Sequence, residues 1–262
     1  MALRQFPDGY YKQFIPKTGI PTRIYKYNSI NDNLLNSLKD GYLWFSKPLD
    51  FNDPFDCWTA LIDFSEPEDY LKKLAKDRFA HLPRNERRNN ERKLMKQSHR
   101  ATGVYRLLID KTAAMMGVCC FTTKNDHILM WSHYAEKHQG ICLEFDPLVQ
   151  LDYFLTAEVH YTDQFQPLNY FKSDEDALII MAITKSTVWE YEGEIRVLRP
   201  TENGKQFFNK SALTGVIFGC KTPVHIIDDI RKLLTDSGYH NVSFRQATMA
   251  KDRFQLSIED LH

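Results

Sequence analysis

The sequence predicts an α+β fold in which strands dominate the second half of the chain. Short apolar segments bounded by turn residues recur from residue 117 onward, which is typical of strands. Helical spacing is instead concentrated in a block at about residues 65–116. A chain of 262 residues is long for one domain and short for two. We therefore predict an irregular lead-in over residues 1–22 and a single domain over 23–262, with the helical insertion at about 65–116.

The first structured unit is expected to be a strand, a helix and a second strand. Residues 23–27 alternate in polarity and are rich in β-forming residues, so they predict a strand. Apolar residues recur with helical spacing over residues 29–39, and Gly41 ends that helix. Residues 42–46 predict the next strand. The loop that follows, residues 47–56, contains two prolines, three aspartates and an asparagine, which argue against regular structure.

The insertion is expected to contain two helices, over residues 65–79 and 104–116, separated by a polar and basic stretch. Strands then return. The predicted strands lie at 117–122, 140–145, 157–161, 189–197, 213–220 and within 242–258, and the predicted helices at 128–136, 174–187 and from Pro223 to about Gly238.

Composition indicates where in the cell the protein is expected and which classes of molecule it is expected to bind. Lys and Arg together number 34, as do Asp and Glu, so overall charge favours neither nucleic acid nor a membrane, and any electrostatic argument must be local. The five cysteines lie mostly in apolar runs, which favours reduced thiols in a cytoplasmic protein over a disulfide framework. The sequence shows no export signal and no apolar run of about 18 residues, so we expect no membrane association.

The most informative segment is Trp189-Glu-Tyr-Glu-Gly-Glu-Ile-Arg-Val197. If it is a strand, Glu190, Glu192, Glu194 and Arg196 share one face. Two interpretations follow: a solvent-facing strand, which is the commoner case, or a site that requires negative charge. In a partly dry site, one of the crowded carboxyl groups should have a raised pKa, and Arg196 could keep the other ionised.

Three other segments have both a structural and a functional interpretation. Tyr25-Lys26-Tyr27 fits a half-buried strand. The loop at 51–56 fits either a functional loop or a turn closed by Asn52 and Asp53. The segment at 127–138, with His133 and Tyr134, is rich in aromatic and histidine residues, but its spacing matches no zinc pattern, so no metal is predicted.

A basic stretch between residues 84 and 100 holds seven Lys or Arg residues against Glu86 and Glu91. It could contact a nucleic-acid backbone. A solvated helix face is more common, and only Tyr105 lies just beyond the stretch for base stacking. We therefore predict a solvated face.

Several motifs occur together in a fixed order. They are Tyr25-Lys-Tyr-Asn-Ser29, Leu43-Trp-Phe-Ser46, Phe51-Asn-Asp-Pro-Phe-Asp56, Cys120-Phe121, Met130-Trp-Ser-His-Tyr134, Gly140-Ile-Cys-Leu-Glu-Phe-Asp146, and Lys185 with Trp189-Glu-Tyr-Glu-Gly-Glu-Ile-Arg196. This ordered set resembles the bacterial domain of unknown function 2971 family over about residues 23–255. That family name carries no activity.

A more distant resemblance does imply one. The opening strand with the helix that ends at Gly41, and the later Glu192-Gly-Glu194-Ile195, are similar to the ADP-ribosyltransferase superfamily. The resemblance implies split antiparallel sheets and NAD as co-substrate. It implies that Glu194 is the catalytic glutamate and Glu192 its partner.

The same resemblance implies where NAD would lie. Tyr25 to Tyr27 would line the nicotinamide side, Phe121 or Tyr134 could stack on the ring, and Lys26 or Arg196 would neutralise the pyrophosphate. Lys26 stands where the superfamily usually has His or Arg. The complete set of expected cofactor-binding residues is Tyr25, Lys26, Tyr27, Ser46, Asn52, Phe121, His133, Tyr134 and Arg196.

The expected function is therefore transfer of ADP-ribose from NAD to a macromolecular acceptor, either protein or nucleic acid. Bacterial relatives of such enzymes include toxins and anti-phage effectors, so the resemblance also implies that role and a neutralising partner. The alternative is a non-catalytic module that binds a nucleotide, a nucleic acid or a protein.

Overall fold

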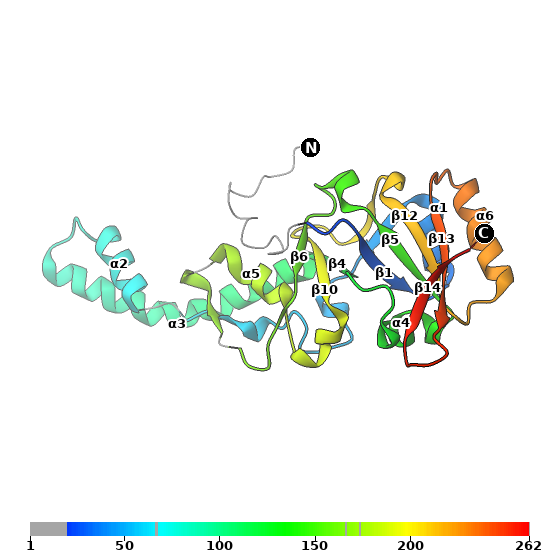
Figure 1. Cartoon of the computed structure of the whole chain (residues 1–262). Helices are drawn as coiled ribbons and strands as arrows, with labels where there is room; N and C mark the ends of the chain where they lie inside the picture. The colour runs from blue at the N-terminus through cyan, green and yellow to red at the C-terminus, as the bar shows by residue number, and fades with distance from the viewer. Residues whose placement is uncertain (1–19, 66–67, 166, 173, 262) are drawn as a thin grey trace.

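The computed structural model describes residues 20–65, 68–165, 167–172 and 174–261 (Figure 1). Most of the lead-in predicted for residues 1–22 therefore lies outside the described residues. The described part is a mixed α+β structure, as predicted, built around one large sheet.

The central sheet has eight strands in the order β14-β13-β12-β5-β1-β4-β10-β6. In that order they are Leu256–Asp260, Ser243–Met249, Leu213–Phe218, Ile141–Phe145, Ile24–Asn28, Gly117–Thr122, Glu194–Arg199 and Thr156–Glu158. Strands β12 and β13 run parallel, whereas the other neighbours in this sheet are antiparallel.

The sheet is weakest between β1 and β4. These strands are joined in register only at Tyr25 and Thr122, whereas β1 pairs with β5 along its whole length and β10 pairs with all of β4. The two separate antiparallel sheets implied by the resemblance are thus one continuous mixed sheet with a single narrow joint. Beyond that joint the two strands diverge, which leaves space for side chains between them.

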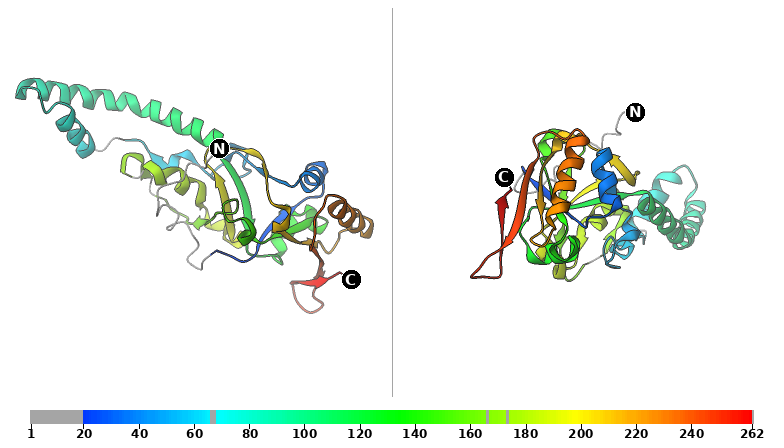
Figure 2. Two further views of the ribbon diagram at one scale, coloured as in Figure 1. Left: turned by 90° about the horizontal axis from the view of Figure 1, so that it is seen from above. Right: turned by 90° about the vertical axis from the view of Figure 1, so that its right-hand side faces the viewer.

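The two faces of the sheet carry different helices, because alternate residues of a strand point to opposite faces. Helices α1 (Asp32–Asp40) and α6 (Val224–Asp236) lie side by side over one face and bury leucine and isoleucine side chains there (Figure 2). The other face is covered by α4 (Ile128–Tyr134), whose Trp131 is fully buried against the edge of Tyr27.

Helices α2 (Glu68–Arg78) and α3 (Arg84–Met115) form an arm that projects away from the sheet (Figures 1 and 2). The sequence predicted a separate helix from residue 104, but α3 is continuous over 32 residues, which corresponds to a length of about 48 Å. Its C-terminal end is anchored, because Ile109 and Ala113 pack in a second apolar cluster with Met181 and Ala182 of α5 (Asp174–Ile183).

Several element boundaries differ from the predictions. The strand expected at 157–161 is divided into β6 and β7, and the helix expected at 174–187 ends at Ile183 because Thr184 and Lys185 pair with β7. The remaining strands are β2 (Tyr42–Phe45), β3 (Ile62–Asp63), β7 (His160–Tyr161), β8 (Leu168–Asn169), β9 (Thr184–Lys185) and β11 (Gly204–Phe207). Short 3-10 helices occupy Pro48–Asp50, Thr59–Leu61, Glu136–His138, Pro147–Gln150, Tyr170–Lys172, Thr187–Glu192 and Lys210–Ala212.

The five cysteines are free thiols. Of the helices that the structure describes, none combines the length and the apolar character that crossing a lipid bilayer requires.

The start of α1 offers a test of the local fold. The side chain of Asn31 accepts a hydrogen bond from the Leu34 backbone N–H at 3.0 Å and caps the helix. We expect Asn31→Ala to lower the free energy of unfolding by about 1 kcal/mol, measured by urea denaturation. Asn36→Ala, an exposed change inside the same helix, is the matched control and should not destabilise the protein. Equal losses in both variants would contradict the capping role.

Candidate functional site

A cavity of about 140 Å³ opens where β1 and β4 diverge. Two larger hollows adjoin it and share some of its lining residues: one of about 540 Å³ shares Lys26, Tyr27 and Tyr134, and one of about 440 Å³ shares Asn52 and Tyr134. The smallest of the three is lined by the buried charged side chains. Its walls are Tyr25, Lys26, Tyr27, Phe51, Asn52, Asp56, Cys120, Phe121, Thr122, Met130, Tyr134, Lys185, Glu192 and Glu194.

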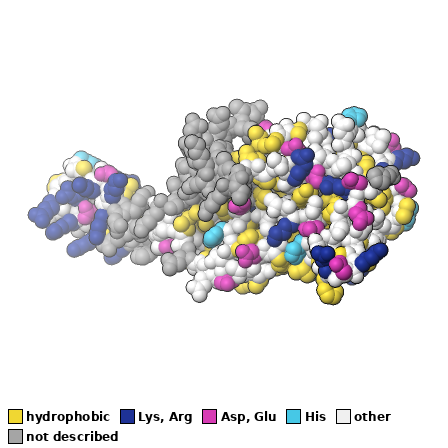
Figure 3. Space-filling model, viewed as in Figure 1, with side chains coloured by type: hydrophobic (Ala, Val, Ile, Leu, Met, Phe, Trp, Pro, Cys, Tyr) yellow, Lys and Arg dark blue, Asp and Glu magenta, His cyan; other side chains and the backbone are white. Residues whose placement is uncertain are grey.

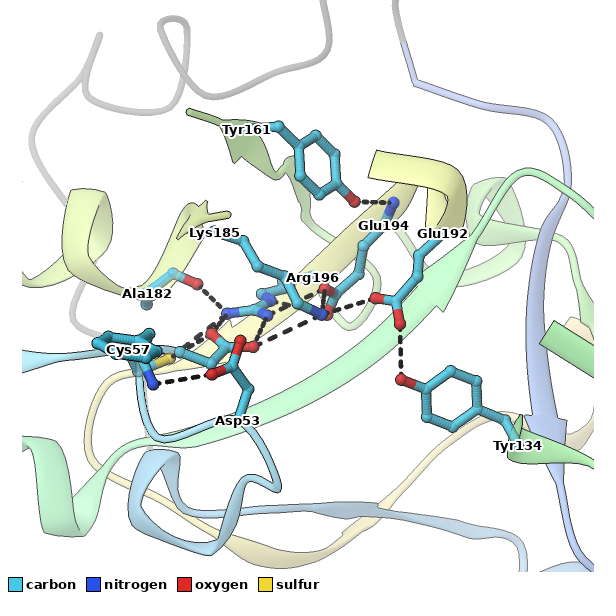
Figure 4. A network of polar contacts seen from close by, with 11 residues as sticks. Asp53, Cys57, Tyr134, Tyr161, Ala182, Lys185, Glu192, Glu194 and Arg196 are labelled. Atoms are coloured by element: carbon cyan, nitrogen blue, oxygen red, sulfur yellow. Dashed lines mark hydrogen bonds and ion pairs between the residues drawn. The ribbon is translucent and has the colours of Figure 1, made fainter. Parts of the chain in front are cut away.

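One wall of this cavity is a buried cluster of three carboxylates and two cations (Figure 4). The Lys185 ammonium lies 2.6 Å from Glu192 Oε2, 2.9 Å from Glu194 Oε2 and 3.6 Å from Asp56 Oδ2. Glu192 and Glu194 are only 3% and 5% exposed, and Arg196 is completely buried. We call these five residues, Asp56, Lys185, Glu192, Glu194 and Arg196, the acidic cluster. Its formal net charge is one negative unit.

The turn before β10 brings the two glutamates together. Residues 187–192 form a 3-10 helix, Gly193 adopts the left-handed conformation with φ of 51°, and the strand begins only at Glu194. The predicted strand was therefore wrong in its first half, and Glu190 is exposed rather than aligned with the other glutamates. The solvent-facing interpretation was also wrong, because Glu192 and Glu194 are buried.

Arg196 is the centre of the acidic cluster. Its guanidinium binds Asp56 through two hydrogen bonds of 2.7 and 2.6 Å, binds Glu194 through two more of 2.8 and 3.0 Å, and donates to the Ala182 carbonyl at 2.7 Å. These contacts use all five of its N–H donors. The expected role of Arg196 in neutralising a pyrophosphate is thereby contradicted, since the guanidinium is buried and saturated.

The surrounding charges keep Glu194 ionised. Burial by itself would raise the pKa of Glu194, but Arg196 and Lys185 reverse that effect and lower the pKa to about 2. Burial likewise opposes the charge of Lys185, yet Glu194 and Glu192 raise the pKa of its ammonium above the ordinary value. Arg196 was expected to keep one of the crowded carboxyl groups ionised, and Glu194 is that group, because both Arg196 and Lys185 face it.

Of the two glutamates, Glu192 retains hydrogen-bonding capacity for a ligand. Glu192 accepts one hydrogen bond on each oxygen, from the Tyr134 hydroxyl at 2.6 Å and from Lys185. Glu194 accepts one bond on Oε1 and two on Oε2. A carboxylate has about four acceptor positions, so Glu192 can accept further hydrogen bonds from a molecule in the cavity. Glu194 is also hydrogen-bonded to the Cys120 side chain, and its four positions are therefore in use.

The opposite wall is largely aromatic. Tyr25 and Tyr27 of β1 line it, and Lys26 donates to the Cys120 carbonyl at 3.2 Å. Phe121 is 3% exposed and packs against other phenylalanines of the core. Tyr134 is half-buried, so it is the better placed of the two to stack on a ligand ring.

Two predicted residues lie away from the acidic cluster. Ser46 pairs through its backbone with Val118 and does not line the cavity. His133 is exposed and lines the neighbouring 440 Å³ hollow with Asn52. Among the residues that the structure describes, no group of His, Cys, Asp and Glu side chains is arranged to hold a metal ion.

Three residues that matter were absent from the predicted site: Asp56, Lys185 and Tyr161. The Tyr161 hydroxyl accepts a hydrogen bond from the Glu194 backbone N–H at 2.8 Å. Asp56 was visible only as the last polar residue of a loop, and Lys185 only as part of a motif. Nothing in the sequence indicates that either residue meets Arg196 or Glu194.

Comparison with known proteins bears on part of this site. Residues 130–197 match a family described as a protein of unknown function (DUF2971). No curated protein and no solved structure matches the chain. The DUF2971 segment runs from α4 into β10 and contains four members of the acidic cluster, all except Asp56. The match supports the family resemblance over this stretch and names no activity.

The ionised state of Glu194 makes stability depend on pH. Its folded-state pKa of about 2 lies below the ordinary value of 4.5. The resulting stabilisation, roughly 3 kcal/mol, is therefore complete above pH 4.5 and is lost as the pH falls toward 2. We expect the difference in unfolding free energy between the wild type and Glu194→Gln to narrow below pH 4.5, measured by urea denaturation at several pH values. A constant difference down to pH 3 would contradict the assignment.

The pairing of Asp56 with Arg196 can be tested separately. Asp56→Asn removes one charge from a buried ion pair and leaves Arg196 undercompensated, so we expect a loss of roughly 3 kcal/mol in unfolding free energy. Asp50→Asn changes an exposed residue of the same loop and is the matched control. If thermal and urea unfolding show the same small change in both variants, the buried pair does not contribute as described.

Proposed function

We propose that this protein cleaves the nicotinamide–ribose bond of NAD and transfers ADP-ribose to a macromolecular acceptor. The observation that carries the proposal is the acidic cluster, which places the ionised Glu194 and the buried Glu192 beside an aromatic wall in a cavity between β1 and β4.

The reaction requires negative charge at this kind of position. When the glycosidic bond breaks, its electron pair goes to the pyridinium nitrogen, neutral nicotinamide leaves, and positive charge develops on the ribose. A fixed carboxylate stabilises that charge most effectively where water is excluded. Glu194 is ionised, nearly buried and held from three sides, so it would contribute about 3–4 kcal/mol to transition-state stabilisation.

The other cluster members would support two further tasks. Arg196 and Lys185 hold the carboxylates in place before substrate arrives, so little reorganisation accompanies the reaction. Glu192, oriented by Tyr134, would accept the proton of the acceptor group as that group forms its bond to the ribose carbon.

The adjoining hollow can hold the remainder of the dinucleotide. Its volume of about 540 Å³ falls within the range of about 300–1,000 Å³ that is typical of ligand pockets. Lys26 and Lys205 line it and could pair with phosphate oxygens. Lys26 donates to the Cys120 carbonyl and is also hydrogen-bonded to the Cys119 side chain, so one of its three donors remains for a phosphate oxygen. This assigns to lysines the charge neutralisation that Arg196 cannot provide.

The alternative, a non-catalytic binding module, is favoured by one observation. Arg196 lies 2.6 Å from Asp56 and 2.8 Å from Glu194, distances that are also expected in an ion cluster with a purely structural role. The two proposals differ in the fate of NAD, which is bound and intact in the alternative but consumed in the favoured one.

The test compares three glutamine variants of neighbouring glutamates by release of nicotinamide from NAD. We expect Glu194→Gln to lower kcat by about 10²–10³-fold, because the charge is lost while the shape is kept. Glu192→Gln should lower transfer to the acceptor more than it lowers hydrolysis of NAD. Glu190→Gln is the matched control, since Glu190 is exposed on the same turn, and it should keep wild-type activity.

Circular dichroism at the assay pH should show that each variant is folded. The proposal fails if Glu194→Gln keeps turnover within about twofold of a measurable wild-type rate. It also fails if calorimetry shows NAD binding to the wild type without any nicotinamide release, which would establish the binding module instead.

A further inference from the structure

The neutral composition of the chain conceals a separation of charge. Residues 71–97, which cover most of α2 and the first half of α3, contain ten Lys or Arg and three acidic residues, a formal net charge of +7. Because the whole chain is neutral, the remainder carries −7. The positive part is the outer portion of the projecting arm, where Lys and Arg side chains gather in Figure 3.

Within the arm, basic residues follow one ridge of α3. Arg84, Arg88, Arg92 and Lys96 are spaced four residues apart, and all four are exposed. Side chains at this spacing are neighbours on the helix surface, so the four form a continuous stripe about 18 Å long. We call these four residues the basic stripe.

Among the described residues of the arm, none forms an ion pair with a member of the basic stripe. Like charges four residues apart destabilise a helix, and the stripe contains three such pairs in succession. The described residues of α3 contain one ion pair, between Arg87 and Glu91 at 3.9 Å, and it involves none of the four stripe residues. A helix face shaped only for solubility would alternate the two signs. The repulsion would be relieved by an external polyanion.

The shape of the arm narrows the class of polyanion. A helix that lies on a lipid surface needs a broad apolar face beside its basic face, but Leu94 and Met95 are the only large apolar residues between Arg84 and Gln97. The arm also projects away from the sheet as a helical rod (Figure 2), so a long partner can lie along it without meeting the body. A duplex carries about one charge per 1.7 Å of its axis, so it presents about ten phosphates over the length of the stripe.

We propose that the arm formed by α2 and the first half of α3 is a nucleic-acid binding surface, with the basic stripe contacting the phosphate backbone of a duplex. The sequence alone favoured a merely solvated face. The structure adds the projection of the arm (Figure 2), the continuous helix that aligns the stripe, and the exposure of Lys73, Lys76 and Arg78 on the neighbouring α2. Backbone contacts of this kind do not read base sequence, so binding would be of low sequence specificity. This inference is independent of catalysis at the acidic cluster.

The test uses a quadruple variant that keeps helix propensity, Arg84→Gln with Arg88→Gln, Arg92→Gln and Lys96→Gln. The matched control carries four Lys→Gln changes at exposed positions elsewhere, Lys47, Lys221, Lys232 and Lys251. Binding of fluorescent DNA and RNA duplexes of random sequence is measured by anisotropy from 50 to 200 mM salt. Far-UV circular dichroism shows whether each variant keeps its helices.

We expect the wild type and the control to bind duplexes with an affinity that falls steeply with salt. The quadruple variant should bind at least about tenfold more weakly, with a salt slope smaller by about 3 to 4. Comparison of the affinities for DNA and for RNA identifies which duplex is preferred. Equal binding by the quadruple variant and the control overturns the proposal. So does binding of the wild type to vesicles of anionic lipid but to neither duplex.

Discussion

The buried guanidinium of Arg196 is the interaction on which the rest of the site depends. It joins three parts of the chain that are distant in sequence: the start of β10, the loop ending at Asp56, and the end of α5 at Ala182. A buried charge is stable only when its partners satisfy it. The full set of donors used by Arg196 therefore constrains the positions of all three segments at once.

This constraint explains why the cavity has its charge. Asp56 and Glu194 form ion pairs with Arg196. Lys185 forms ion pairs with both Glu192 and Glu194 and so links Glu192 to this cluster. Two cations hold three carboxylates, so the acidic cluster itself keeps one formal negative charge, and Lys26 lines the same cavity. A cluster balanced in charge would have no such preference for a ligand that is, or becomes, a cation.

The arm and the acidic cluster both pack on the same apolar cluster. The C-terminal end of α3 packs in the apolar cluster that also contains Cys57 and Ala182. Cys57 follows Asp56, and the Ala182 carbonyl binds Arg196. The outer half of the arm, in contrast, makes no contribution to that core in the described residues. Its basic surface can therefore differ in charge from the body without cost to the packing beneath the cavity.

The sequence by itself determined the α+β class, the opening strand and helix, and the segment that contains the paired glutamates. These features depend on local signals: alternation, helical spacing, and stop residues such as Gly41. A local pattern also singled out Glu192 and Glu194, whereas Tyr25 and Tyr134 were expected at the site only through the distant resemblance; all four line one cavity.

Only the tertiary structure decided which charges meet. Arg196 pairs with Asp56, which lies 140 residues away along the chain. No local pattern in the sequence indicates such a contact, so the sequence left Arg196 available to bind a phosphate. Because the chain turns at Gly193, Glu190 is exposed while Glu192 is buried in the site. The strands β1 and β4 are paired at one position, so the structure has one sheet where two were expected. The physical reason is common to all three: burial and long-range pairing depend on how elements pack, whereas periodicity depends only on neighbours along the chain.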